Sequence, residues 1–299
     1  MKSKIYGAIM GLIVGDALGV PFEFKQRDTF RCDGMMGFGT YNQPPGTWSD
    51  DSSMTLATID SIVKNNGKVI PKDIMDNFCK WLYKAEFTPY GKVFDIGNTT
   101  RIALERYYYG GKPINECGAR DVRSNGNGAL MRILPLAFAD FGDGSNIQVI
   151  SSLTHAHRIS TDACEIFINI AEGLASGEDL NISMGFAALE NYKGTSFERL
   201  TKLETLSRDE IRSSGYVVDT LEAALWCLLK TDNYTDAVLT AVNLGDDTDT
   251  VAAVAGGLAG MMYGVGGEKG IPEEWIKRIA MLEYIEKLIS SFENTISEA

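Results

Sequence analysis

The sequence predicts an all-α fold, and three observations support that prediction. Apolar residues recur at the 3.6-residue spacing of a helix along most of the chain. Runs that alternate apolar and polar residues, as a half-buried strand does, are nearly absent. No repeat, low-complexity segment or linker rich in proline and glycine divides the 299 residues. We therefore expect a single domain over residues 1–299 with a dozen or more helices.

The first expected helix, Lys4–Leu18, has a glycine at every fourth position from Gly7 to Gly19, so one of its faces carries no side chains. A late helix, Val251–Gly264, consists almost entirely of small residues. A glycine inside a helix costs about 1 kcal/mol relative to alanine. Because both helices tolerate so many small residues, we expect helix backbones to approach closely there.

The same spacing predicts further helices at Ser52–Lys64, Lys72–Lys84, Asn98–Tyr109, Thr161–Ser176, Thr220–Leu229 and Thr235–Leu244. The clearest apolar stripe runs from Pro272 to Phe292. Pro272 is suited to a first helical turn, and Glu283 and Lys287 form a supporting pair four residues apart. We expect one helix over that range.

The charge of the chain argues against two classes of partner. Lys and Arg number 28 and Asp and Glu number 40, which gives a formal net charge of −12. Such a chain repels nucleic-acid phosphates and anionic lipid. The apolar run Ile5–Val14 is shorter than the ~20 residues of a membrane span. We expect a soluble, cytoplasmic monomer that binds neither nucleic acid nor membrane.

Cysteines and histidines exclude two kinds of site. The five cysteines are widely separated and contain no C-x-x-C pair, so the chain has no disulfide framework and no cysteine zinc site. The only histidines are His155 and His157. A metal centre with several histidine ligands is therefore excluded.

Two acidic clusters stand at expected helix starts. The first, Gly46–Ser52, contains Ser49, Asp50 and Asp51, and the second, Gly245–Thr250, contains Asp247, Asp249 and Thr250. One interpretation is helix capping, which Ser, Thr and Asp favour. The other is metal binding, because several adjacent carboxylates repel one another unless a cation neutralises them. Oxygen ligands would favour Mg²⁺, Mn²⁺ or Ca²⁺ over zinc.

Four more segments are polar beyond what a core needs. Glu23 follows the end of the first helix, and Asp95 opens the polar turn Asp95–Thr100. Ser124–Arg132 begins with alternating Asn and Gly and resembles a backbone cradle for an anion, although Asn-Gly pairs usually mark turns. Thr154–His157 holds both histidines, and a histidine is often only a hydrogen-bonded structural residue.

Taken together and in this order, the segments resemble the ADP-ribosylglycohydrolase family. The resemblance is carried by G-x-x-x-G-D-A-x-G at Gly11–Gly19, P-F-E at Pro21–Glu23, W-S-D-D-S at Trp48–Ser52, D-I-G-N-T-T at Asp95–Thr100, S-N-G-N-G-A-L-M-R at Ser124–Arg132, T-H-A-H at Thr154–His157, S-G-Y-V-V-D at Ser214–Asp219 and G-D-D-T-D-T at Gly245–Thr250. The segments around Asp95 and Tyr216 are closest to the bacterial, arginine-directed branch.

The resemblance implies an all-α domain whose cleft holds two divalent cations, Mg²⁺ or Mn²⁺, and which removes ADP-ribose from a modified protein. It implies the metal ligands Ser49, Asp50, Asp51, Asp247, Asp249 and Thr250. It implies a diphosphate loop of Ser124, Asn125, Gly126, Asn127 and Gly128, with His155 and Tyr216 lining the cleft. It implies catalysis by Glu23 near the ribose and Asp95 near the leaving group, together with Asp50 and Asp247.

Other functions remain as alternatives at this point. Within the family, the linkage could be to serine, to poly-ADP-ribose or to a small molecule, or the chain could bind ADP-ribose without cleaving it. An isoprenoid diphosphate synthase would need D-D-x-x-D, but Met54 stands where the third aspartate is required after Asp50. A dehalogenase-type phosphatase would carry Asp247–Val251 early and after a strand, whereas here it is late and precedes a helix.

Overall fold

The computed structural model describes residues 3–141, 146–186 and 189–298. In chain order its α-helices are α1 (Lys4–Gly19), α2 (Asp50–Lys64), α3 (Pro71–Lys84), α4 (Asn98–Tyr108), α5 (Ile147–Ser152), α6 (Arg158–Ser176), α7 (Leu180–Phe186), α8 (Val217–Lys230), α9 (Tyr234–Val242), α10 (Thr248–Tyr263), α11 (Glu273–Ile276) and α12 (Leu282–Glu298). Short 3₁₀ helices are η1 (Val20–Phe22), η2 (Gly39–Tyr41), η3 (Ile114–Glu116), η4 (Leu130–Arg132), η5 (Leu134–Phe138), η6 (Leu189–Tyr192), η7 (Glu198–Thr205) and η8 (Arg208–Glu210).

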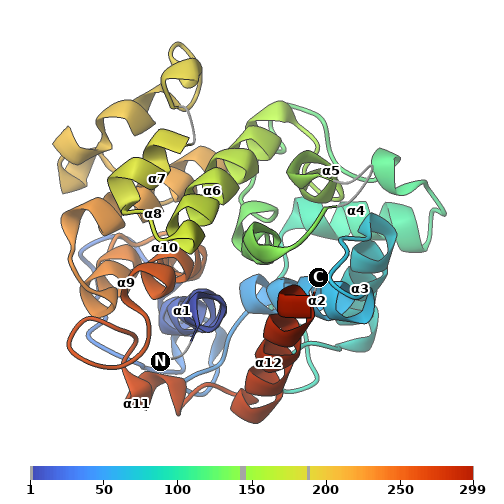
Figure 1. The fold of residues 1–299 in the computed structure, drawn as a ribbon, viewed down its shortest axis with the longest axis horizontal. Coiled ribbons are helices and arrows are strands. Elements are labelled where there is room, and N and C mark those ends of the chain that lie inside the picture. Colours follow the sequence, from blue (N-terminus) through green and yellow to red (C-terminus); the bar gives the residue numbers. More distant parts are fainter. Residues whose placement is uncertain (1–2, 142–145, 187–188, 299) are drawn as a thin grey trace.

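The all-α prediction is confirmed. Within the described ranges there is no β-strand, and extended segments pair only as isolated bridges such as Gly126 with Tyr216. Figure 1 shows α1 near the middle of the molecule, with α9 and α10 on one side and α2 and α12 on the other. The buried apolar side chains of these helices belong to one core cluster.

The glycine-lined face of α1 packs directly against α10. A Cβ atom added to Gly7 would lie 2.3 Å from the carbonyl oxygen of Gly260, and one added to Gly15 would lie 2.1 Å from that of Ala252. No real Cβ fits at such distances, so the expectation of close backbone approach is confirmed. Because the two helices run antiparallel, the end of α1 meets the start of α10, where a Cβ on Gly19 would lie 2.3 Å from the Cα of Asp249.

The apolar N-terminal segment is longer in the structure than its sequence run indicated. Lys4–Phe22 is continuously helical over 19 residues with a mean hydropathy of 1.7, which is long and apolar enough to span a membrane by length and composition. However, 94% of that segment is buried inside the fold. Its apolar composition therefore has a structural use in the core, beside α10.

The prediction of one helix from Pro272 to Phe292 is wrong, because the chain breaks between α11 and α12. The Ala280 N–H donates to the Gly46 carbonyl at 2.9 Å, and the indole of Trp48 donates to the Ala280 carbonyl at 3.0 Å. Met281 then takes a left-handed φ of 57°. Contacts with a distant turn thus replace the helical hydrogen bonds that the local sequence favoured.

The starts of α2 and α10 also differ from expectation. Their helical turns begin at Asp50 and Thr248, two to three residues before the expected Ser52 and Val251. The carboxylates of both acidic clusters therefore lie within or next to a first helical turn. There the exposed N–H groups and the helix dipole favour negative charge.

Candidate active site

The two acidic clusters meet in space. Ser49 caps α2, and its hydroxyl donates to Asp51 Oδ2 at 3.2 Å. From the start of α10, the Thr250 hydroxyl approaches the same Asp51 oxygen at 3.4 Å. Residues almost two hundred positions apart thus contribute to one carboxylate-rich site, as the sequence predicted.

Asp16, which lies on α1 and is fully buried, fixes the start of α2. Its carboxylate accepts hydrogen bonds from the backbone N–H groups of Ser49 and Ser52 at 3.0 Å and from the Ser52 hydroxyl. Burial raises the pKa of Asp16 to about 6, and these hydrogen bonds oppose the rise. In the sequence Asp16 is recognisable only as part of a motif, whereas the structure gives it a positioning role.

Glu23 and Asp95 lie beside Asp249 of the second acidic cluster. One oxygen each of Glu23, Asp95 and Asp249 lies within 4.8 Å of the others. Burial, followed by the charge of Asp95, raises the pKa of Glu23 to about 9. Glu23 is expected near the ribose and Asp95 near the leaving group, and the structure places oxygens of these two carboxyl groups within 4.8 Å of each other.

Several carboxylate oxygens of the site have no hydrogen-bond partner. Glu23 Oε2, Asp51 Oδ1 and Asp247 Oδ1 are all buried without one. Burial, followed by the charges of neighbouring carboxylates, raises the pKa values of Asp50, Asp51 and Asp249 well above the ordinary value. A buried acceptor without a donor is costly, so these residues could hold a ligand that supplies positive charge. Such an all-oxygen donor set fits Mg²⁺ or Mn²⁺.

The glycine-rich loop Ser124–Gly128 lies beside this site, joined to the segment before α8. The Asn127 N–H donates to the Gly215 carbonyl and the Val217 N–H to the Asn125 carbonyl, both at 3.0 Å. Gly126 and Tyr216 lie opposite each other between these two bonds as a non-hydrogen-bonded pair. The Gly126 N–H therefore forms no hydrogen bond with Tyr216. Backbone donors of the loop can therefore face a ligand.

The asparagine side chains of the loop have structural contacts. Asn125 Oδ1 accepts from the Ser160 hydroxyl at 2.9 Å and contacts the His157 ring at 3.0 Å. Asn127 Nδ2 donates to Asp247 Oδ2 at 2.9 Å and to the Thr220 hydroxyl at 3.0 Å. Asn127 thus joins the loop to the acidic site. The ligand role expected of these residues falls mainly on their backbone.

A buried arginine supports the loop from behind. Arg132 is fully buried, and its Nε donates to the Gly128 carbonyl at 3.1 Å. Its Nη2 donates to the Thr154 hydroxyl at 2.9 Å, which contacts His155 Nδ1 at 2.8 Å. Burial, followed by the charge of Arg132, lowers the pKa of His155 to about 3, so the imidazole is neutral. Arg132 forms no ion pair among the described residues.

Three other expected site residues, Asp95, Tyr216 and His155, lie in segments between helices. Asp95 does not cap α4, because Gly97 occupies the cap position and no side chain bonds there. Capping therefore does not explain this carboxylate. Tyr216 is the residue before α8 and is half-buried beside the loop. His155 is almost fully buried, next to Gly128.

Tyr41 is the site residue that the sequence analysis missed. Its hydroxyl lies close enough to Glu23 and Asp95 to lower the pKa of both carboxyl groups, against the rise that burial causes. Tyr41 ends η2, a 3₁₀ turn inside a hairpin in which Phe38 pairs with Gln43. No motif or periodicity marks this hairpin. The only available signal is the density of Gly and aromatic residues between Gly34 and Tyr41.

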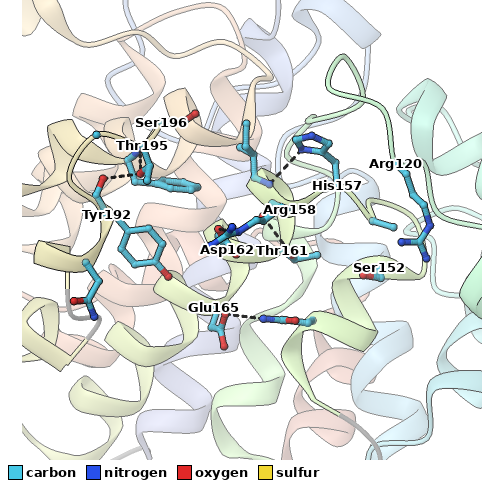
Figure 2. A pocket seen from close by; sticks show the side chains of 16 residues that line it. Arg120, Ser152, His157, Arg158, Thr161, Asp162, Glu165, Tyr192, Thr195 and Ser196 are labelled. Atoms are coloured by element: carbon cyan, nitrogen blue, oxygen red, sulfur yellow. Dashed lines mark hydrogen bonds and ion pairs between the residues drawn. The ribbon is translucent and has the colours of Figure 1, made fainter.

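A cavity of about 1080 Å³ lies on the other side of the loop, and Figure 2 shows the residues that line it. They come from the start of α6, from α5 and from the segment around Tyr192–Phe197. His157 connects the cavity to the glycine-rich loop, because it lines the cavity and its ring also contacts Asn125 of the loop. None of the expected metal ligands lines it, so it is separate from the acidic site.

Comparison with known proteins gives one consistent result. A family model described as ADP-ribosylglycohydrolase matches residues 1–298. The chain is 37% identical over 286 residues to "ADP-ribosylarginine hydrolase Tri1" of Pseudomonas putida, covering 94% of this chain and 76% of that protein. It is 31% identical over 292 residues to "ADP-ribosyl-[dinitrogen reductase] glycohydrolase" of Rhodospirillum rubrum, covering 94% and 92%. A solved structure described as an "ADP-ribosylglycohydrolase-related protein complex" matches with a TM-score of 0.81 at 31% identity, covering 98% of each chain.

Proposed function

The chain belongs to the ADP-ribosylglycohydrolase family, and from this premise we propose that it removes ADP-ribose from arginine side chains of proteins. The observation that carries the arginine linkage is the pair Glu23 and Asp95, two carboxyl groups whose oxygens lie within 4.8 Å of each other, beside Tyr41. The names of the relatives from Pseudomonas and Rhodospirillum support the same class of reaction.

The reaction is hydrolysis of the N-glycosidic bond at C1″ of the ribose. Water forms the new C1″–O bond while the C1″–N bond breaks, and one water proton is transferred to the departing guanidine nitrogen. A guanidinium is planar, and one carboxylate can hold it through two parallel N–H···O bonds. Asp95 would hold the departing guanidine in this way, and Glu23 would orient the ribose on the other side of the bond that breaks. A carboxyl group that transfers a proton in such a step contributes about 10²–10⁴ in rate.

The acidic site fits a pair of divalent cations. Ser49, Asp50, Asp51, Asp247, Asp249 and Thr250 would hold Mg²⁺ or Mn²⁺, since buried oxygens of Asp51 and Asp247 have no other partner. Bound divalent cations orient hydroxyl oxygens and make water a better nucleophile at neutral pH. Asp16 holds the Ser49–Ser52 turn through hydrogen bonds that need no cation.

The diphosphate of ADP-ribose would lie on the glycine-rich loop. The net charge of the chain is −12, so an anion needs local donors. The Gly126–Gly128 backbone supplies N–H groups, and Arg132 places a buried positive charge behind them. His155 and Tyr216 border the same surface.

The test compares two linkages and one variant. Wild-type enzyme with Mg²⁺ or Mn²⁺ should release ADP-ribose from ADP-ribosyl-arginine protein faster than from serine-linked protein, because a neutral serine side chain offers no planar cation for the Asp95 carboxylate to hold. Asp95→Asn should lower kcat on arginine-linked protein by about 100-fold, within the range for a proton-transferring group. Its affinity for ADP-ribose, measured by calorimetry, should change by less than about threefold. Equal or faster cleavage of the serine linkage by the wild-type enzyme would contradict the proposed specificity.

A further inference from the structure

Three aromatic side chains, which we call the aromatic row, extend from the carboxylates to the surface. The row consists of Phe24, Tyr41 and Phe94. The ring centroids of Phe24 and Tyr41 are 6.5 Å apart at 62°, and those of Tyr41 and Phe94 are 5.1 Å apart at 55°. Phe24 follows Glu23 in the chain, Phe94 precedes Asp95, and the Tyr41 ring contacts both phenylalanine rings. The row thus joins the two chain segments that carry the carboxylates.

Phe24 stands in a conformation that does not suit it. The Lys25 N–H donates to the Phe22 carbonyl at 3.0 Å, Glu23 has φ −51° and ψ 139°, and Phe24 has φ 65°. This is a type II turn with Phe24 at the position where glycine is preferred. The Phe24 N–H also donates to the Asp246 carbonyl at 2.7 Å, which fixes the turn beside the second acidic cluster.

Burial does not compensate for this strain, because 69% of Phe24 is exposed. An exposed aromatic residue with a positive φ is unfavourable both in backbone conformation and in hydration. Strained residues of this kind cluster at functional sites. A glycine would make the turn without strain, so the side chain itself is what the position retains.

We propose that the aromatic row is the contact surface for the polypeptide that carries the modified arginine, with Tyr41 beside the arginine side chain and Phe24 packing against the residues that flank it in the substrate protein. This rests on the proposed function. The occupant is set by charge and shape. The guanidinium is a planar cation, and aromatic faces beside carboxylates attract such cations. The row leads from the Glu23–Asp95 pair, where the guanidine departs, to solvent, where the rest of the substrate protein lies.

The row should therefore distinguish a protein substrate from a free conjugate. Phe24→Ala should raise KM for an arginine-ADP-ribosylated protein about tenfold, the size expected of one lost aromatic contact to the flanking residues. The ratio of KM for that protein to KM for free ADP-ribosyl-arginine should rise at least fivefold. Phe24→Trp should restore most of the ratio, because it returns an aromatic face.

A matched control separates the side chain from the strain. Met281 is also a bulky residue with φ 57°, 51% exposed, in the break between α11 and α12. Phe24→Gly and Met281→Gly should both keep or raise the melting temperature, by up to about 3 °C, because each relieves a left-handed residue. Only Phe24→Gly should raise the KM ratio.

The outcomes separate this proposal from the proposed function. If wild-type enzyme cleaves arginine-linked protein and Phe24→Ala leaves the KM ratio unchanged, the aromatic row is not the contact surface. If Phe24→Ala weakens inhibition by free ADP-ribose as much as it raises KM for the protein, the ring stacks on adenine and the proposal is overturned. If wild-type enzyme cleaves no arginine linkage at all, the proposed function fails, and with it the occupant of the row.

Discussion

The two sides of the candidate site carry buried charge of opposite sign, and neither charge is paired within its own side. The acidic side comprises Asp50, Asp51, Asp247 and Asp249, and the loop side comprises Ser124–Gly128 with Arg132 behind it. On the acidic side, buried carboxylate oxygens of Asp51 and Asp247 have no hydrogen-bond partner. On the loop side, a fully buried guanidinium has no carboxylate partner among the described residues.

The two sides also differ in how far they are organised before a ligand binds. Arg132 donates to the Gly128 carbonyl and the Thr154 hydroxyl and lies 4.5 Å from the centre of the Phe78 ring, so most of its contacts are already made. The carboxylates instead lie close together and repel one another. A ligand that combines cations with a diphosphate would balance both sides at once. The loop side should therefore respond to changes of shape, and the acidic side to changes of charge.

The largest effect should come from removing one charge on the acidic side. Asp247→Asn keeps the shape and the acceptor for Asn127, but it replaces a charged ligand by a neutral one. We expect kcat to fall by about 1000-fold or more, since a lost charged contact in the transition state is worth several kcal/mol. Release of ADP-ribose from modified protein measures it.

The neighbouring residue supplies the control for that prediction. Asp246 has the same side chain, is exposed, and has a φ of 59° that asparagine tolerates. Asp246→Asn should keep activity within about twofold. Comparable losses in both variants would mean that overall charge, and not the position of Asp247, sets the rate.

The next effect tests shape on the loop side, where two glycines differ. A Cβ on Gly128 would lie 2.9 Å from His155 Cε1 and 3.0 Å from the Thr100 hydroxyl, whereas one on Gly126 would have no contact under 3.5 Å. Gly128→Ala should therefore weaken ADP-ribose binding about 30-fold, or roughly 2 kcal/mol. Gly126→Ala should weaken it by less than about threefold.

Calorimetry with ADP-ribose and, separately, with Mn²⁺ checks this difference. The Mn²⁺ affinity should change little in both variants, because neither glycine belongs to the acidic side. If affinity for Mn²⁺ falls together with affinity for ADP-ribose, the loop is a structural turn and not an anion cradle.

These differences also show what the sequence could reveal. Close backbone approach at α1 and at α10 was predictable, because the small residues of each helix are a local signal that survives in the fold, although the sequence did not show that the two helices pack against each other. The meeting of the two acidic clusters followed from family resemblance, and both clusters mark helix starts by their own residue types. Helix starts and close helix contacts are encoded locally.

Features that depend on distant partners were not predictable. The break before Met281 depends on hydrogen bonds from Ala280 to Gly46 and from Trp48 to Ala280, which no local pattern shows. Tyr41 reaches the carboxylates only because its hairpin folds back on Glu23, whose carbonyl accepts from the Thr40 hydroxyl at 2.7 Å. The spacing of residues along the chain does not indicate such contacts between distant segments.

A smaller effect should follow from the hydroxyl that links Arg132 to His155. The Thr154 hydroxyl accepts from Arg132 and can donate to His155 Nδ1, which leaves the imidazole proton on Nε2. That Nε2 faces the loop, where a Cβ on Gly126 would lie 3.5 Å from it. Thr154→Val removes the hydroxyl and should weaken ADP-ribose binding about fivefold to tenfold, the size of one hydrogen bond.

Two variants check whether this loss concerns the hydrogen bond. Thr154→Ser keeps the hydroxyl and should restore most of the affinity. Thr58→Val removes a buried hydroxyl that donates to the Met54 carbonyl inside α2, and it should leave the affinity unchanged. An equal loss of affinity in Thr154→Ser and Thr154→Val would attribute the effect to packing.

The smallest effect concerns stability without cations and is the most direct test of charge repulsion. Asp51 is buried, and burial followed by the charges of Asp16, Asp50 and Asp247 raises its pKa. A carboxyl group whose folded pKa is raised holds its proton to higher pH in the folded than in the unfolded chain. Stability then falls as pH rises above the unfolded value of about 3.9, and the full cost is reached above the folded pKa.

Asparagine at this position does not titrate, so Asp51→Asn should be more stable than wild type in chelator, by about 1 kcal/mol or 2–4 °C at pH 8. The gain should shrink toward pH 4, where the wild-type carboxyl is protonated in the folded chain and about half protonated in the unfolded chain. Added Mn²⁺ should reverse the order, because it binds the wild-type site more tightly and stabilises the folded state. Asp246→Asn, at an exposed carboxylate, should show no such gain. Melting curves of wild type, Asp51→Asn and Asp246→Asn in EDTA and in Mn²⁺, at pH 5 and pH 8, measure these differences in stability. A gain for Asp51→Asn that is independent of pH would refute the charge explanation.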